Sequence, residues 1–131
     1  MNTEEMKDIR ESVTANLLDQ FCEFADEVEL SVYENQTLIG QNSINRLLLI
    51  ADKERKLILN DEVISRINII LGVKSDLMIL YPNQNLVGLI RQPSALHQNK
   101  SIIAMMLLSP SSDSLMEIRK PLLIKKMQLR T

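Results

Sequence analysis

The chain has 131 residues, a net charge of −2 at pH 7 and a hydrophobic content of 45%, with two Phe, two Tyr and no Trp. This length and composition predict a domain with an aliphatic core. Three glycines are too few for an all-β fold with many tight turns or for a glycine-rich phosphate loop. A single cysteine, Cys22, excludes an internal disulfide, and we expect it to be a small buried hydrophobic residue.

Charge and hydropathy also bear on location and partners. No stretch approaches the roughly 20 apolar residues that span a bilayer, and the acidic start MNTEEMKD is unlike a signal peptide. We therefore expect a cytoplasmic protein. Residues 1–34 hold ten acidic and two basic residues, whereas residues 35–131 hold seven acidic and thirteen basic ones. The acidic segment could shield a nucleic-acid surface, although a solvated acidic helix is the simpler interpretation.

The first helix is predicted to begin at Thr3, because acidic residues follow it where the helix dipole favours them. One apolar face then continues at helical spacing to about Ala25: Met6, Ile9, Val13, Leu17, Phe21 and Phe24. Residues 26–39 are ambiguous, since some of their apolar residues alternate as in a strand. We favour a helix, because an isolated strand would have no partner.

Gly40 precedes a third expected helix, residues 41–51, that begins with the polar run QNSINR. Two helices separated in this way have the layout of a degenerate helix-turn-helix, in which the start of the second helix reads bases. The candidate DNA-binding residues are Gln41, Asn42, Ser43, Asn45 and Arg46. A purely structural role is the alternative, since any helix with a polar face has this pattern.

The run NDEVISRINIILGVKSDLMILYPN, residues 60–83, predicts two short helices. Asn60 can cap the first helix, whose apolar stripe comprises Val63, Ile64, Ile67, Ile70 and Leu71. Gly72 would end that helix in a left-handed conformation. A second apolar turn, residues 76–80, would then stop before Pro82.

Further short helices are expected at residues 85–91 and 102–108, the second capped by Ser101, with a loop around Pro93 between them. The last helix should begin near Ser112 or Ser114, and Pro121 should kink or split it near Arg119. The predicted fold is all-α, a compact bundle of about seven or eight short helices.

The sequence offers little support for catalysis. His97 is the only histidine, and a Ser/His/Asp or Cys/His mechanism would have to use it. It stands in a polar stretch with no acidic residue nearby, so we expect it on the surface. Neither metal-ligand spacing nor a phosphate loop is apparent, and we expect a non-enzymatic protein without metal or cofactor.

The run SRINIILGVKSDLMILYPN resembles the start of the toxin-binding domain of Xre/MbcA/ParS-type antitoxins, which partner RES-domain toxins that attack NAD. That family typically carries an ERISLILGIYKALRILFPN-like run, and the match here is long and nearly free of gaps. Its second signature, W-x-R-x-P-N and then G-G-[RK]-S before an apolar helix, is matched at Arg91, Pro93, Lys100 and Ser101.

The chain departs from the second signature at several positions. Leu89 replaces the Trp, Ser94 the Asn, and Ala104 a frequent Asp. Gln98 and Asn99 replace Gly-Gly, which removes residues that adopt positive φ easily, although Asn99 tolerates it. The resemblance covers about residues 59–126.

The resemblance implies an antitoxin-like protein with an N-terminal helical region, residues 1–58, for dimerisation and DNA contact, and a toxin-binding domain, residues 59–131. It would bind and neutralise a RES-type toxin as a homodimer and regulate its own operon. The residues expected to bind the partner are Arg91, Pro93, Lys100, Ser101, Arg119 and Lys120. The alternative is a small helical DNA-binding transcription regulator without a toxin partner.

The basic C-terminal run IRKPLLIKKMQLRT supports two interpretations. It could insert apolar residues against the toxin while its cations meet acidic groups, or it could be a last core helix with a frayed basic end. On the first interpretation, a truncation after Leu115 should leave a folded chain, because terminal segments are tolerant of loss.

Overall fold

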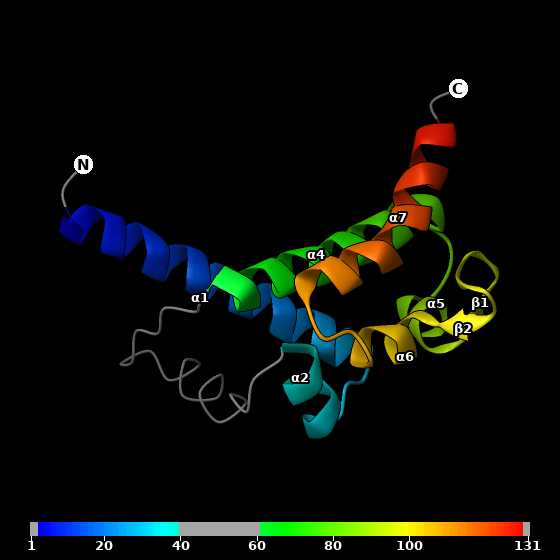
Figure 1. Cartoon of the computed structure of the whole chain (residues 1–131), viewed down its shortest axis with the longest axis horizontal. Coiled ribbons are helices and arrows are strands. Elements are labelled where there is room, and N and C mark those ends of the chain that lie inside the picture. Colours follow the sequence, from blue (N-terminus) through cyan, green and yellow to red (C-terminus); the bar gives the residue numbers. More distant parts are fainter. Residues whose placement is uncertain (1–2, 40–60, 130–131) are drawn as a thin grey trace.

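The computed structural model describes residues 3–39 and 61–129, which are mostly helical (Figure 1). The predicted all-α class is confirmed. In chain order the elements are α1 (Thr3–Glu27), α2 (Val32–Ile39), α4 (Asp61–Leu80), α5 (Leu86–Arg91), β1 (Pro93–Ser94), the 3₁₀ helix η1 (Ala95–His97), β2 (Lys100–Ser101), α6 (Ile102–Leu107) and α7 (Ser112–Gln128). β1 and β2 pair antiparallel, with Pro93 opposite Ser101.

Helix α4 is the centre of the fold, with its most extensive contacts to α7 and the next most extensive to α1 (Figure 1). This placement explains its sequence, which is apolar on more than one side. A single hydrophobic core joins these helices and includes Leu17, Leu18, Phe21, Phe24, Val28, Leu38, Ile39, Val63, Ile67, Ile70, Val73, Leu77, Leu86, Ile90, Ile102, Ile103, Met106, Leu115, Ile118 and Leu122. The core therefore draws on both sides of the predicted division at residue 58, and that division stays a prediction.

The prediction that Gly72 separates two helices was wrong, because α4 runs unbroken from Asp61 to Leu80. A glycine inside a helix costs roughly 0.5–1 kcal/mol relative to alanine. Here it serves close packing: a Cβ atom at Gly72 would lie 2.5 Å from the guanidinium carbon of Arg119 on α7. The helix ends before Pro82, as predicted. The proposed cap Asn60 lies outside the described residues.

Residues 26–39 are largely helical, so the helical interpretation is confirmed and the strand alternative was wrong. α1 continues to Glu27 and ends in a Schellman-type turn, in which Glu29 has φ 59° and the N–H of Leu30 donates to Ala25 O at 2.9 Å. Ser31 then starts α2 with a capping box: Glu34 N–H donates to Ser31 Oγ, and Ser31 N–H donates to the Glu34 carboxylate.

The apolar face predicted for the first helix reaches the core only in its second half. Phe21 and Phe24 are buried with their ring centroids 6.1 Å apart. The other end of α1 extends beyond the remaining described elements (Figure 1). There Met6, Ile9 and Val13 are about half exposed.

The predicted starts of the last three helices are confirmed by their caps. Asn85, Ser101 and Ser111 each accept a backbone N–H at the start of α5, α6 and α7. Pro121 does not split α7, which continues to Gln128. Figure 1 shows the final turns of α7 bending away from the line of its first turns, as a proline inside a helix favours.

Arg66 of α4 is a buried cation that holds the end of α2. Its guanidinium donates to Leu38 O at 2.7 Å, to Thr37 O at 3.4 Å and to Ser109 O at 3.1 Å. Burial lowers the pKa of Arg66, but carbonyl groups at a helix C-terminus favour a cation. None of the helices in the described ranges has the length and apolarity needed to cross a membrane.

Candidate partner-binding site

Arg91, expected to bind a partner, makes its contacts within the chain. Its guanidinium donates to Val28 O and Glu29 O at 2.8 Å each, and to the Glu34 carboxylate at 2.8 and 3.2 Å. The hydrogen bond from Arg91 holds the pKa of Glu34 below its ordinary value. Arg91 therefore ties α5 to the junction between α1 and α2, where carbonyls at the end of α1 favour a cation.

Arg119 also faces inward. Its Nε donates to Asp76 at 2.8 Å, and Lys126 Nζ donates to the same carboxylate at 2.6 Å. The side chain of Asp76 is fully buried. Burial alone would raise the pKa of Asp76, but the hydrogen bonds from Arg119 and Lys126 bring it below its ordinary value. This ion cluster fixes α7 against α4.

The remaining residues expected to bind a partner are near the surface. Pro93 and Ser101 face each other across the β1–β2 pair, and Ser101 also caps α6. Lys100 is exposed on β2. Lys120 is exposed on α7 and pairs with Glu117 at 2.7 Å. The structure thus brings Pro93, Lys100 and Ser101 together, while Arg91 and Arg119 are engaged in internal contacts.

The loop between the two strands adopts the backbone that Gly-Gly would have made easy. Gln98 has φ 57° and Asn99 has φ 62°, both in the left-handed region. Asn tolerates this conformation better than Gln does. The loop therefore holds two residues other than glycine in the left-handed region, at some cost in backbone strain.

His97 is buried rather than on the surface, so that prediction was wrong. Only 3% of it is exposed. Its Nε2 lies 2.8 Å from Ile118 O of α7, and its Nδ1 lies 2.9 Å from Ser94 Oγ. Since a carbonyl oxygen only accepts, Nε2 must carry a proton, and in the neutral ring Nδ1 accepts from Ser94. His97 thus fastens the strand loop to α7.

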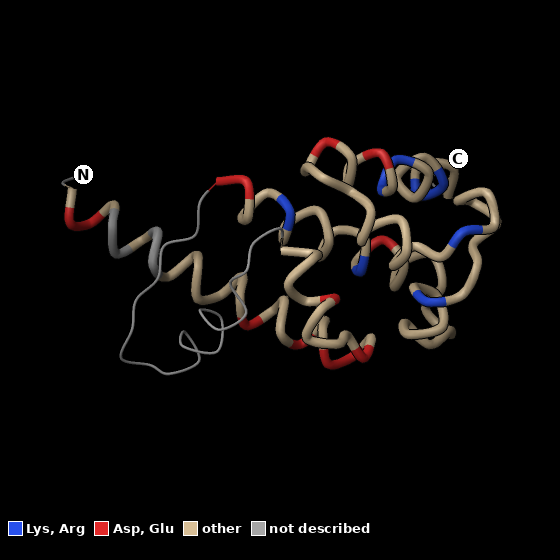
Figure 2. Tube along the Cα trace, turned by 60° about the horizontal axis from the view of Figure 1, so that its bottom comes forward, with Lys and Arg blue, Asp and Glu red and all other residues tan. Residues whose placement is uncertain are grey.

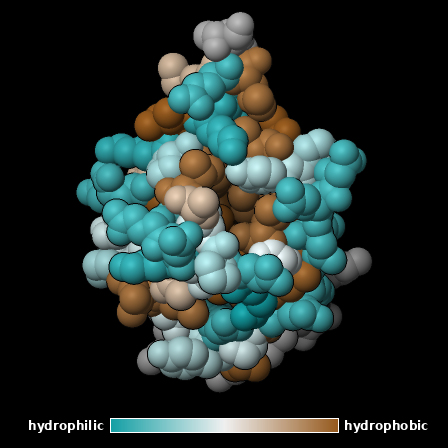
Figure 3. Space-filling model, turned by 90° about the vertical axis from the view of Figure 1, so that its right-hand side faces the viewer, coloured by the Kyte–Doolittle hydropathy of each residue, from teal (hydrophilic) through white to brown (hydrophobic). Residues whose placement is uncertain are grey.

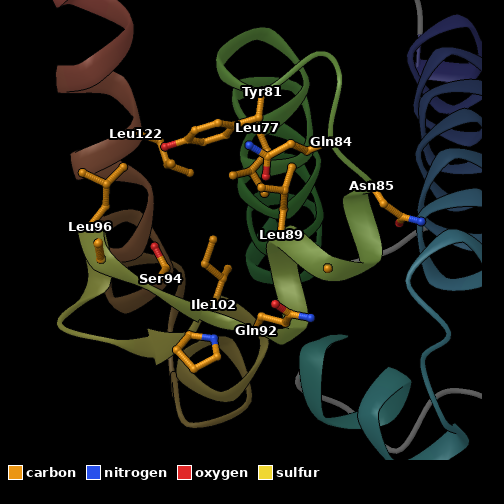
Figure 4. A pocket seen from close by; sticks show the side chains of 13 residues that line it. Leu77, Tyr81, Gln84, Asn85, Leu89, Gln92, Ser94, Leu96, Ile102 and Leu122 are labelled. Atoms are coloured by element: carbon orange, nitrogen blue, oxygen red, sulfur yellow. The ribbon is translucent and has the colours of Figure 1, made fainter.

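A cleft of about 420 Å³ lies beside this loop. It is bounded by the end of α4, by α5, by the β1–η1 segment, by the start of α6 and by α7 (Figure 4). Apolar side chains from these elements point into it, and several neutral polar groups edge it; the lining includes Leu77, Tyr81, Gln84, Leu89, Gln92, Pro93, Ser94, Leu96, Ile102 and Leu122. Of the residues expected to bind a partner, only Pro93 lines the cleft.

The end of α7 continues this face of the molecule. Leu122 is buried, whereas Ile124, Met127 and Leu129 are exposed by 57%, 68% and 63%. Figure 3 shows a hollow with apolar residues inside it and further apolar residues on the projecting end above. Basic residues gather at the same end of the molecule, toward the C-terminus, while acidic residues predominate elsewhere (Figure 2).

Other predicted features are either outside the described residues or differ from expectation. Residues 41–46, the candidate DNA-binding segment, are outside, so the helix-turn-helix stays a prediction. Cys22 is exposed rather than buried. Partial burial, followed by the charges of Asp19 and Asp26, raises the pKa of its thiol, which makes a poor nucleophile. Residues 3–39 and 61–129 hold no cluster of His, Cys, Asp and Glu that could bind a metal ion.

The sequence does not reveal the cleft, because its lining combines residues 77–96 with Ile102 and Leu122, which meet only in the fold. The apolar exposure at the end of α7 could have been anticipated, since the run LLIKKMQL mixes apolar and basic residues without regular burial. Comparison of the chain with protein-family models, curated proteins and solved structures finds no match.

Proposed function

We propose that this chain is an antitoxin-like protein that binds a RES-type toxin and prevents it from consuming NAD. The observation that carries the proposal is the end of α7. That segment is anchored on the body by buried Leu122 and by the contact of Lys126 with Asp76. Beside these two anchoring residues the segment exposes Ile124, Met127 and Leu129.

An anchored helix with an exposed apolar end is suited to binding another protein. Apolar side chains that gather in one exposed place mark interaction sites more often than isolated ones do. The anchor also limits the conformational entropy that binding would remove. Lys125 lies beside these residues with its Nζ 3.1 Å from Tyr81 Oη, and it can meet an acidic group on the toxin. The resemblance of residues 65–83 to the antitoxin family suggests the class of partner that this surface would serve.

The start of α1 supports the expected homodimer. Met6, Ile9 and Val13 follow the three- and four-residue spacing of a helix-pairing seam and are about half exposed. A second copy of the same helix would cover them. Light scattering should give the mass of a dimer for the full chain and of a monomer for Ile9→Glu, while Tyr33→Glu, on α2, serves as an exposed control.

The experiment that tests the toxin partnership is co-expression with the product of the neighbouring gene, which the proposal predicts to be a RES-type toxin, followed by purification of the complex. The full chain should elute with the toxin as a stoichiometric complex. The double variant Ile124→Glu, Met127→Glu places two charges in the proposed contact and should elute alone. Leu108→Glu, at the residue that directly follows α6 and is 84% exposed, is the matched control and should still bind. Loss of binding in the control, or its survival in the double variant, would refute the proposed contact.

A further inference from the structure

The cleft between α4, α5, the β1–η1 segment and α7 has the size and shape of a binding site. Its volume of about 420 Å³ falls within the roughly 300–1,000 Å³ of typical ligand sites. Leu77, Leu89, Ile102 and Leu122 supply its apolar walls. The hollow is open to solvent on one side (Figure 3), so a side chain can enter without any movement of the backbone.

The lining of the cleft is uncharged, but cations lie beside it. The residues that line it carry no charge, and the polar groups at its edge belong to Tyr81, Gln84, Gln92 and Ser94. Cations stand next to that edge. Lys125 lies with its Nζ 5.2 Å from the centre of the Tyr81 ring, and exposed Lys100 pairs across the strands with Ser94.

Asp76, the acidic residue in the second half of α4, is fully buried and already bound to Arg119 and Lys126. It therefore offers no competing negative charge at the surface. An apolar hollow with cations beside it complements an apolar group that carries negative charge on either side.

We propose that this cleft is the docking site for a short segment of a partner protein that presents one bulky apolar side chain between acidic residues. The apolar side chain fills the hollow, and the flanking carboxylates lie near Lys125 and Lys100. A single buried anchor of this kind commonly supplies much of the affinity of an interface. Gln84 and Gln92 can hydrogen-bond the backbone on either side of the anchor.

This inference rests on the proposed function only if the partner is the toxin, because Ile124, Met127 and Leu129 do not line the cleft, although Lys125 serves both contacts. Two contacts would then hold one toxin, and either could fail without the other. A small apolar molecule is the alternative occupant, and it would not require the acidic flanks.

Gly88 provides a direct way to close the cleft. It lies on α5 and lines the cleft, and a Cβ atom built on it meets nothing within 4 Å. A side chain added at this position therefore starts in open space at the cleft, and a large one is expected to occupy the hollow. Gly88→Phe blocks the cleft, and Gly88→Ala, which adds only a methyl group, is the matched control.

The test uses a phage-displayed library of random 12-residue peptides, panned on the full chain and depleted on the Gly88→Phe variant. The proposal predicts that the recovered peptides share a Leu, Met or Phe flanked by Asp or Glu. A fluorescent copy of the most frequent peptide then gives a Kd by anisotropy. Circular dichroism melting checks that each variant is folded.

The expected result is a Kd at least about tenfold weaker for Gly88→Phe and within about twofold of the original for Gly88→Ala. Lys125→Glu should weaken binding several-fold and reduce its dependence on salt. Leu108→Glu should have no effect. Recovery of no peptide that depends on Gly88, or of peptides whose flanks are basic or neutral, would overturn the inference.

The same variants separate this inference from the proposed function. If Gly88→Phe loses the peptide but keeps the toxin complex, the cleft serves a partner other than the toxin and the proposed function stands. If Gly88→Phe loses both, the toxin uses the cleft. If the peptides fail while the Ile124→Glu, Met127→Glu variant still loses the toxin, only the docking inference is wrong.

Discussion

Gly72 on α4 packs directly against the guanidinium group of Arg119 on α7. A Cβ atom at Gly72 would approach Arg119 Cζ and Nη1 to 2.5 Å. From this position Arg119 reaches Asp76, one helical turn further along α4, at 2.8 Å. The absence of a side chain at residue 72 thus permits the ion cluster that holds the two central helices together.

Gly72→Ala should destabilise the chain, against the usual effect of this change in a helix. Alanine favours a helix interior by roughly 0.5–1 kcal/mol, but the methyl group would push Arg119 from Asp76 and cost about 1–3 kcal/mol in charged hydrogen bonds. We expect a net loss of about 1 kcal/mol in the free energy of unfolding, measured with urea. Gly88→Ala, where the methyl group meets open space, should show a gain of about 0.5–1 kcal/mol. Equal gains in both variants would contradict this account.

The same cluster predicts a loss of stability in acid. Because the pKa of Asp76 is lower in the folded chain than its ordinary value of 3.8, its charge stabilises the fold above that value, and this contribution disappears as the pH falls through the lower, folded pKa. Unfolding by urea between pH 2 and pH 7 should show this decline.

Asp76→Asn should be less stable at pH 7 by about 2–4 kcal/mol, because two cations lose their partner, and its decline in acid should be shallower. Some loss of stability in acid should remain, because the hydrogen bond from Arg91 lowers the pKa of Glu34 as well. If the free energy of unfolding of Asp76→Asn fell with decreasing pH as steeply as that of the unaltered chain, the ion cluster would not be the cause of the loss of stability in acid.

The C-terminal helix should be required for folding, which reverses the expectation drawn from sequence. Ile118 and Leu122 are buried, and both cation partners of Asp76 lie beyond residue 115. A chain that ends at Leu115 should therefore lack cooperative unfolding, as circular dichroism melting would show. Leu122→Ala alone should cost about 2–5 kcal/mol, while Leu129→Ala, at an exposed position, should cost almost nothing. A truncated chain that melts cooperatively would restore the original expectation.

Local signals in the sequence were sufficient for most helix boundaries. Asn85, Ser101 and Pro82 act through neighbouring backbone groups, so their effects are visible without the fold. Gly72 was misinterpreted because its role depends on Arg119, which is 47 residues away in the sequence. His97 was misplaced for the same reason, since its partner Ile118 O comes from another helix. The polar residues around His97 in the sequence predicted a surface position, but its contact with Ile118 O holds it in the interior.

The candidate site was predicted less well than the fold. The sequence analysis named Arg91 and Arg119 as partner-binding residues, but in the structure they bind carbonyl and carboxylate groups of the chain itself. Charge alone cannot distinguish an arginine that caps a helix from one that meets a partner. The cleft could not be predicted in the same way, because Ile102 and Leu122 join residues 77–96 only in the folded chain.

The helix-turn-helix hypothesis predicts that the double variant Asn45→Ala, Arg46→Ala weakens binding to the chain's own promoter without lowering its melting temperature. Base contacts by Asn and Arg each contribute roughly 1–3 kcal/mol. The protein concentration that shifts half of the promoter DNA in an electrophoretic assay should therefore rise at least about tenfold. Affinity should also fall steeply with added salt. Lys120→Ala, at an exposed cation on α7, is the control. Promoter binding that is absent, or unchanged in the double variant, would remove the hypothesis.

The most direct test is the rate at which the purified RES-type toxin consumes NAD while the full chain is titrated into the reaction. The account predicts that NAD consumption falls to background and that inhibition saturates at a fixed molar ratio. The Ile124→Glu, Met127→Glu variant should require at least about tenfold more protein, whereas Leu108→Glu should match the unaltered chain. Undiminished NAD consumption in the presence of excess folded chain would contradict the central claim.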